Sequence, residues 1–131
     1  MTGASQGIGA AIVEALAVAG VALMVSGQNA DRLTAFAADL ADRIEVQVTP
    51  IAADLAEANE VERLATESLA VLDGLDILVN NAGISIPESI GSVTARSWDA
   101  VMALNVCTAL LSARVGAAIA RRGWPTATSR R

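Results

Sequence analysis

Three glycines near the amino end, Gly3, Gly7 and Gly9, lie in the sequence Thr-Gly-Ala-Ser-Gln-Gly-Ile-Gly. Glycine has no Cβ atom, so a turn built from it can bend tightly and let a ligand approach the backbone. Residues 10–19 that follow favour a helix, whose first N–H groups have no partner within it and attract phosphate. The spacing therefore predicts a pyrophosphate-binding turn. A glycine-rich turn without a ligand is the alternative interpretation.

Polar residues also follow two predicted strands. Asp54 comes after the candidate strand 44–52, and Asn81 comes after the candidate strand 75–80. In a doubly wound parallel sheet the ligand crevice lies beyond the carboxyl ends of the strands. We therefore expect these residues to meet the glycine turn there. For Asp54 the alternative is a solvated turn residue that caps the next helix, and for Asn81 it is a simple tight turn.

The elements that must position these residues alternate between helix and strand. Apolar periodicity predicts helices at 7–19, 30–42, 57–72 and 95–122, and strands at 21–26, 44–52 and 75–80. Asn29 is a plausible N-cap for the second helix. Pro50 predicts that pairing of its strand stops or bends nearby. This alternation predicts an α/β fold, a Rossmann-type doubly wound parallel sheet with helices on both faces.

The motifs resemble, in order and context, those of the short-chain dehydrogenase/reductase family of classical type. They are the glycine turn, Asp54-Leu55, Asn80-Asn81-Ala82-Gly83, and Asn105 in a long helix. The resemblance covers about residues 2–124. It implies NADP or NAD as cofactor and hydride transfer between nicotinamide and a carbonyl or alcohol substrate. It does not identify that substrate.

The resemblance also implies roles for particular residues. The cofactor-binding residues would be Gly3, Ser5, Gln6, Gly7, Ile8, Gly9, Asp54, Leu55, Asn81, Ala82 and Gly83. Asp54 and Leu55 would lie against the adenine. Asn105 would be a catalytic residue, which helps to hold a water molecule in a proton relay.

The choice between NADP and NAD depends on the residues at the end of the predicted strand 21–26. An acidic residue about 20 positions beyond the glycines normally binds the ribose 2′-hydroxyl, but Ser26, Gly27 and Gln28 stand there. Gln6 occupies a place where many phosphate-preferring members of the family have a basic residue. Arg32 is close in sequence, and we expect it to face solvent. The missing carboxylate favours NADP slightly, and the sequence leaves both cofactors open.

The catalytic tyrosine and lysine that the resemblance implies are not found in this chain. Its 131 residues contain no tyrosine, and its nine basic residues are all arginine. Ser129 is a weak substitute for the family's serine, because arginines flank it. We therefore expect this chain to be inactive by itself. The alternatives are a non-catalytic dinucleotide-binding module and a gene fragment without function.

Both ends of the chain depart from the family pattern. The first strand is reduced to Met1, and the strands after the fourth are missing. We expect residues 1–124 to form an incomplete dinucleotide-binding domain and residues 125–131 to form an aberrant tail. A late start and a frameshift or premature stop near Trp124 would explain this pattern. A chain without its central strand is expected to be unstable, since buried backbone groups lose their partners.

Composition limits the other possibilities. The length of 131 residues suits one domain, and the net charge of −5 argues against a nucleic-acid partner. Glu14 and Gly20 interrupt the apolar run 10–27, so no membrane span is expected. The single cysteine, Cys107, fits a reducing cytoplasm and a buried structural thiol. No metal site is predicted, and the homo-oligomer of intact family members is doubtful for this chain.

Overall fold

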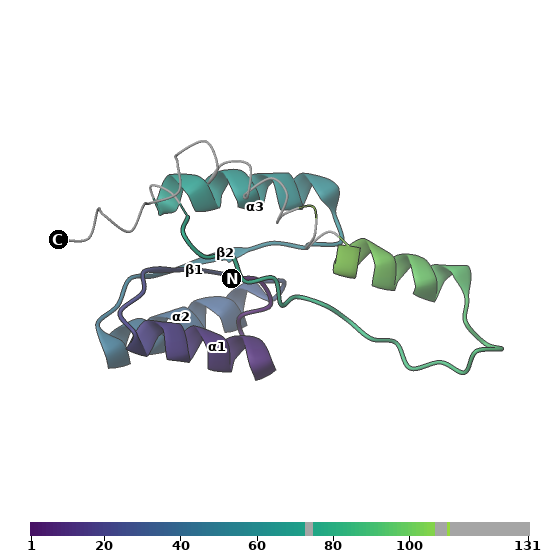
Figure 1. The fold of residues 1–131 in the computed structure, drawn as a ribbon, viewed down its shortest axis with the longest axis horizontal. Coiled ribbons are helices and arrows are strands. Elements are labelled where there is room, and N and C mark those ends of the chain that lie inside the picture. The colour runs from purple at the N-terminus through teal and green to yellow at the C-terminus, as the bar shows by residue number, and fades with distance from the viewer. Residues whose placement is uncertain (73–74, 107–109, 111–131) are drawn as a thin grey trace, which may run out of the picture.

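The computed structural model describes residues 1–72, 75–106 and 110. In chain order it contains α1 (Gly7–Val18), β1 (Leu23–Gly27), α2 (Ala30–Ile44), β2 (Val48–Ala52) and α3 (Ala58–Val71). Residues 95–106 form a further helix. Helices α1 and α2 lie on one side of the strands and α3 on the other (Figure 1). The predicted α/β architecture is therefore confirmed.

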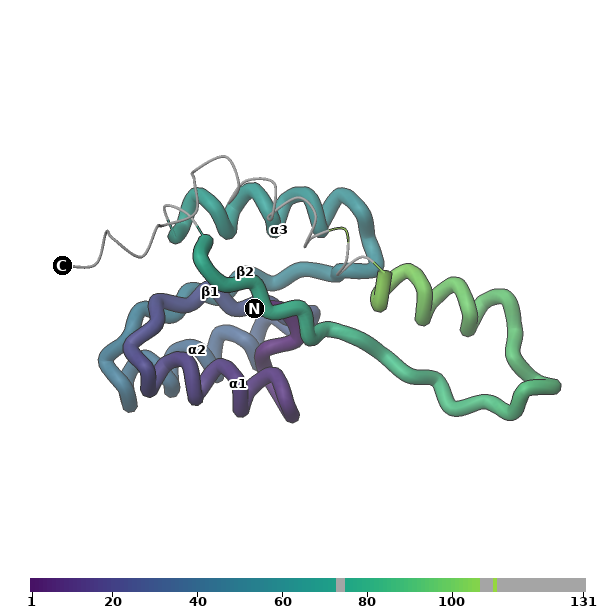
Figure 2. The backbone as a smooth tube through the Cα atoms, in the orientation of Figure 1, coloured from purple at the N-terminus to yellow at the C-terminus, as the bar shows by residue number. Residues whose placement is uncertain are grey.

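Strand β1 has neighbours on both of its edges. It pairs in parallel with β2, with Leu23 opposite Val48 and Gly27 opposite Ala52. Along its other edge run residues 1–4, where Thr2 forms a parallel bridge with Ser26. The segment 75–83 passes beside the amino terminus on the far side (Figure 2). The amino-terminal residues thus occupy the central place predicted for the first strand.

The predicted fourth strand at 75–80 is not formed as a strand in the described part of the chain. One backbone hydrogen bond joins it to its neighbour, from the N–H of Thr2 to the carbonyl of Val79 at 3.1 Å. A strand needs a continuing ladder of such bonds. In the described part of the chain, this single bond does not continue into a ladder.

Pairing of β2 stops near Pro50, as predicted, but two residues beyond the proline instead of at it. Strand β2 continues through Pro50, which lies opposite Val25, and ends at Ala52. The N–H of Ala53 donates to Gly27 at 3.2 Å, so alternation along the strand turns the proline nitrogen away from β1. Within the described residues, β2 has β1 as its only partner. A proline on that free edge costs no hydrogen bond.

Helix α2 begins and ends at identifiable signals. The side chain of Asn29 accepts a hydrogen bond from the N–H of Arg32 at 2.8 Å, which confirms the predicted N-cap. The helix ends at Ile44, and the capping residue that follows, Glu45, has a left-handed φ of 55°. Its buried stripe, Leu33, Ala37 and Leu40, has helical spacing and faces the sheet.

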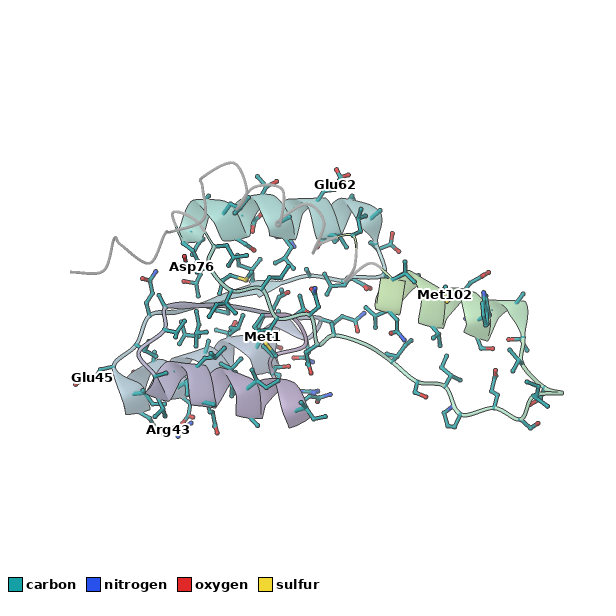
Figure 3. The ribbon with its side chains drawn as sticks, in the orientation of Figure 1. Met1, Arg43, Glu45, Glu62, Asp76 and Met102 are labelled. Carbon is teal, nitrogen blue, oxygen red and sulfur yellow. The ribbon has the colours of Figure 1, made fainter. Side chains whose placement is uncertain are left out.

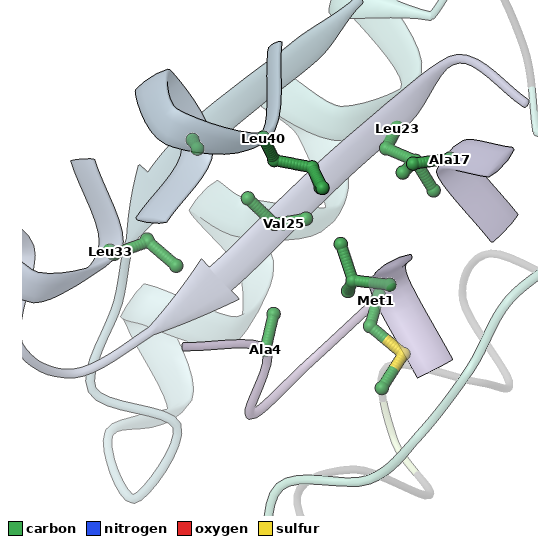
Figure 4. Close-up of a cluster of buried hydrophobic side chains, with 9 residues drawn as sticks. Met1, Ala4, Ala17, Leu23, Val25, Leu33 and Leu40 are labelled. Carbon is green, nitrogen blue, oxygen red and sulfur yellow. The ribbon is translucent and has the colours of Figure 1, made fainter. Parts of the chain in front are cut away.

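The core has two clusters because the side chains of β1 alternate between its faces. Leu23 and Val25 pack with α1 and α2, as Figure 4 shows, whereas Met24 packs with α3. The first cluster comprises Met1, Ala4, Val13, Ala17, Leu23, Val25, Leu33, Ala37 and Leu40. The second comprises Met24, Ala53, Leu55, Val61, Leu64 and Ala65. Both faces of the sheet are therefore covered.

The amino group of Met1 is buried inside this core. It donates a hydrogen bond to the carbonyl of Met24 at 2.9 Å. Burial lowers the pKa of this amino group from 8.0 to about 6, because desolvation disfavours the charged form.

The carboxyl-terminal expectations are tested only in part. Residues 95–106 confirm the start of the predicted long helix. Cys107, Ser129 and the tail 125–131 lie outside the described residues. No helix in the described ranges is long and apolar enough to cross a membrane.

Candidate functional site

The glycine turn packs tightly against the start of α1. Gly3 and Gly7 have φ values of 62° and 57°, a conformation that glycine adopts without steric cost. A Cβ on Gly9 would stand 1.9 Å from the carbonyl oxygen of Gly3, and a Cβ on Gly3 would stand 2.9 Å from the Cα of Ala82. Glycine at positions 3 and 9 thus allows three backbone segments to meet.

Gly7 faces open space, unlike Gly3 and Gly9. No described atom lies within 4 Å of the point where its Cβ would stand. The N-cap residue of α1, Gln6, makes no side-chain capping bond in the described structure, whereas α2 is capped by Asn29. Ile8 on the first turn is 75% exposed. The start of α1 therefore presents an open face with uncapped N–H donors.

Asn81 joins the segment after Val79 to the glycine turn. Its Nδ2 donates to the carbonyl of Gly3 at 3.0 Å and to that of Thr2 at 3.3 Å. The Thr2 hydroxyl accepts from the backbone N–H groups of Asn81 and Ala82, both at 3.1 Å. Thr2 is buried, so these bonds satisfy groups that water does not reach. The two motifs form one hydrogen-bonded unit.

Asp54 lies beyond the end of β2, half-buried, and bonds to its surroundings through both oxygens. Oδ2 accepts from Nε2 of Gln28 at 2.9 Å, and Oδ1 accepts from the N–H of Ala56 at 3.0 Å. The second bond matches the turn role considered for Asp54, and the first ties it to the end of β1. Leu55 is 4% exposed and packs in the core beneath α3.

The end of β1 meets the glycine turn through two further contacts. A Cβ on Gly27 would stand 3.3 Å from the Oγ of Ser5. The Nη1 of Arg32 donates a hydrogen bond to Oε1 of Gln6. Arg32 is exposed, as expected, yet its guanidinium reaches the turn instead of pointing only into solvent.

Asn105 lies on the helix of residues 95–106 and binds the backbone of Ile84. Its Oδ1 accepts from the Ile84 N–H at 3.0 Å, and its Nδ2 donates to the Ile84 carbonyl at 3.1 Å. A Cβ on Gly83 would stand 3.2 Å from the same Oδ1. The predicted catalytic asparagine therefore contacts the segment that follows Asn80-Asn81-Ala82-Gly83.

The structure brings the predicted site residues to the carboxyl edge of the sheet, linked from one motif to the next. Thr2 and Gln28 were not predicted as site residues, and Arg32 was expected to face away. For Thr2, a hydroxyl residue directly before the first glycine of the motif was the sequence signal that could have identified it. The other two contacts join residues 26 positions apart, so local sequence gives little sign of them.

Metal-ligating clusters and surface grooves are the other kinds of site that the described part of the chain could offer. No group of metal-ligating side chains is found there. A groove of about 190 Å³ lies between residues 86–93 and the helix of residues 95–106, lined by Ile86, Glu88, Val93, Ser97, Trp98 and Val101. None of the predicted site residues lines it.

A parallel sheet with helices on both faces, and a glycine turn at its carboxyl edge, defines a dinucleotide-binding fold of Rossmann type. The family model described as "short chain dehydrogenase" matches residues 1–121. The chain therefore belongs to the short-chain dehydrogenase/reductase family, which confirms the resemblance.

Relatives and solved structures agree with this assignment. A glucose 1-dehydrogenase of Gluconobacter oxydans is 36% identical over 87% of this chain and 43% of that protein. The L-sorbose reductase of Gluconobacter frateurii, solved with NADPH and L-sorbose, is 32% identical with a TM-score of 0.88, covering 94% of this chain and 47% of that one. The alcohol dehydrogenase of Thermococcus sibiricus, solved with 5-hydroxy-NADP, is 28% identical with a TM-score of 0.88, covering 94% and 53%. The chain spans about half the length of these proteins.

Proposed function

We propose that this chain binds a nicotinamide dinucleotide, NADP(H) in preference to NAD(H), and is the cofactor-binding part of a short-chain oxidoreductase. The observation that carries the proposal is the open, uncapped start of α1 above the glycine turn. The missing carboxylate after β1 supports NADP(H), as do the NADP(H)-type ligands of the solved relatives.

The residues present fit such a cofactor. The N–H groups at the start of α1 would hold the pyrophosphate, with Gly7 allowing its close approach. Asp54, next to the end of β1, would lie by the adenine, and Ala82 and Gly83 would leave room for the nicotinamide ribose. When bound, the nicotinamide supplies the hydride that the family exchanges with a carbonyl or alcohol carbon. Asn105 would position water beside it.

A pair of glycine variants tests the proposal. Gly7 and Gly20 both have positive φ and open space where a Cβ would stand, but they lie at opposite ends of α1. Gly7→Ala and Gly20→Ala therefore share the backbone strain and differ in their distance from the turn. NADPH and NADH are titrated into the 131-residue polypeptide and both variants by calorimetry.

We expect saturable binding by the parent chain and by Gly20→Ala. Gly7→Ala should bind about 10- to 100-fold more weakly, because overpacking a close contact costs roughly 1–3 kcal/mol. Equal affinities of the two variants would contradict the proposed cradle, and no binding of either dinucleotide would contradict the proposed function.

A second candidate function is a dinucleotide-binding module without catalysis. It is favoured by the absence of tyrosine from all 131 residues. Without a proton-transfer group the hydride step would lose about 10²–10⁴ in rate. NADPH oxidation with a panel of ketones and aldehydes separates the candidates: turnover supports the enzyme, and binding without turnover supports the module.

A cytoplasmic location belongs to the same proposal. Support for it comes from the reducing conditions that nicotinamide chemistry and a single cysteine suit. Fractionation of cells that express the chain would test it.

A further inference from the structure

Arg63, on the second turn of α3, joins that helix to the end of β2. Its Nη2 donates a hydrogen bond to the carbonyl of Ala52 at 2.7 Å. Ala52 is the last residue of β2, and Asp54 follows it by two positions. One side chain of α3 therefore holds the backbone immediately before Asp54.

The carbonyl of Ala52 lies on the free edge of β2. The N–H of Ala53 donates to Gly27 of β1 at 3.2 Å, and successive backbone groups of a strand point to opposite edges. The Ala52 carbonyl therefore points away from β1, which is the only partner of β2 among the described residues. Arg63 thus supplies a donor where the described part of the sheet offers none.

Two carboxylates of the same helix fix the direction of the Arg63 guanidinium. Both oxygens of Glu60 accept from it, from Nε at 3.1 Å and from Nη2 at 2.6 Å. Nη1 donates to both oxygens of Glu67 at 3.1 Å. Residues three and four positions apart on a helix are neighbours, and a two-point contact with a carboxylate fixes the orientation of a planar guanidinium. Nη2 is thereby held in the direction of Ala52.

The segment that Arg63 holds carries Asp54 and Leu55 into the junction of β2 and α3. Leu55 is buried and packs beneath α3. Glu57, the N-cap residue of α3, makes no side-chain capping bond in the described structure. The position of Asp54 therefore depends on contacts with both neighbouring elements: Gln28 beyond β1 holds its carboxylate, and Arg63 of α3 holds the backbone before it.

We infer that Arg63 is a positioning residue of the adenine subsite, which acts through Asp54 without touching the cofactor. This inference rests on the proposed function. A carboxylate has about four acceptor sites, so the bonds to Gln28 and Ala56 leave sites on Asp54 for the 6-amino group of adenine. If the end of β2 moves, Asp54 loses that bond, whereas the pyrophosphate cradle at the start of α1 is unaffected.

The test compares NADPH with its hypoxanthine analogue, in which an oxygen replaces the 6-amino group of the base. The matched control for Arg63 is Arg43, which also bonds two carboxylates, those of Glu14 and Asp39. Figure 3 shows Arg43 on the opposite side of the strands from α3, the helix that carries the labelled Glu62. Affinities for both dinucleotides are measured by calorimetry on the full 131-residue chain and on Arg63→Met, Arg63→Lys and Arg43→Met.

Arg63→Met removes the donor to Ala52 and keeps an unbranched side chain that favours a helix. We expect it to weaken NADPH binding about 3- to 10-fold, the factor that corresponds to one net hydrogen bond, and to leave binding of the hypoxanthine analogue unchanged. Arg63→Lys, which keeps the charge beside Glu60 and Glu67, should show a smaller loss of the same kind. Arg43→Met should change neither affinity.

Urea denaturation shows whether each variant folds, and if Arg63→Met does not, the comparison is made on Arg63→Lys. Equal weakening of both dinucleotides is the result of a general loss of structure and would overturn the inference. No effect on either dinucleotide would overturn it as well, and in both cases the proposed function stands. If the parent chain binds neither dinucleotide, both fail.

Discussion

Replacing Gly9 by alanine is expected to separate the glycine turn from helix α1. The new Cβ would lie 1.9 Å from the carbonyl oxygen of Gly3 and 2.7 Å from Nδ2 of Asn81. The Gly3 oxygen is a backbone atom and has no rotamer by which to move away. Reaching an ordinary contact of 3.4 Å requires the turn to shift by about 1.5 Å.

The cost of this shift follows from the contacts it disturbs. Overpacking costs about 1–3 kcal/mol. The Asn81 bonds to Gly3 and Thr2, at 3.0 and 3.3 Å, contribute roughly 0.5–1.5 kcal/mol each and would break. Alanine regains about 1 kcal/mol over glycine in a helix. The net expectation is a loss of about 1–5 kcal/mol from a total stability that is typically about 5–15 kcal/mol.

Urea denaturation followed by circular dichroism measures this loss. Gly91→Ala is the control, because its Cβ would meet nothing within 4 Å and its φ is not positive. Both changes remove one glycine from the unfolded chain, so that contribution cancels to first order. Gly9→Ala should lower the midpoint by about 1–2 M relative to the control. Equal midpoints would refute the packing argument.

Two further predictions concern the amino-terminal residues. Thr2→Val removes the acceptor for the N–H groups of Asn81 and Ala82, so it should lower the free energy of unfolding in urea by about 1–3 kcal/mol. Thr2→Ser keeps the acceptor and is the control. Equal stability of the two variants would contradict this prediction. Burial lowers the pKa of the Met1 amino group from 8.0 to about 6, so the unfolded chain binds more protons than the folded chain between these values. The free energy of unfolding should therefore rise by about 2 kcal/mol from pH 6 to pH 8 in urea titrations. An N-terminally acetylated chain should lack this rise, and a flat profile for the free amine would contradict it.

Much of the fold could be predicted because local patterns determine it. The apolar stripe of α2 and the cap at Asn29 are both local signals, and the helix lies where they place it, extending to Ile44 instead of residue 42. The segment 75–80 has an equally clear strand pattern but lacks a strand's hydrogen bonds. Pairing depends on a neighbour distant in sequence, which no local pattern reports.

The candidate site divides in the same way. Glycine spacing and the residues after each strand indicated the correct edge of the sheet. The sequence could not show why β2 tolerates Pro50 within its paired residues, because that depends on which edge of β2 is free, a tertiary property. The contact of Arg32 with Gln6 likewise requires α2 to pack beside α1. The packing of the helices and strands decides which side chains contact one another, and therefore which charges meet at the site.

The glycines of the turn have separate duties, so their variants should fail in different ways. Gly3 and Gly9 face protein backbone, whereas Gly7 faces open space. A ligand that binds only the folded state adds about 2.7 kcal/mol at 100 times its dissociation constant. Saturating dinucleotide could therefore offset the packing loss of Gly9→Ala only if the displaced turn still binds it. Asn81 binds the turn to its neighbouring segment. Gly9→Ala, which displaces the turn, should therefore lose stability and binding together. Gly7→Ala should lose binding separately from stability.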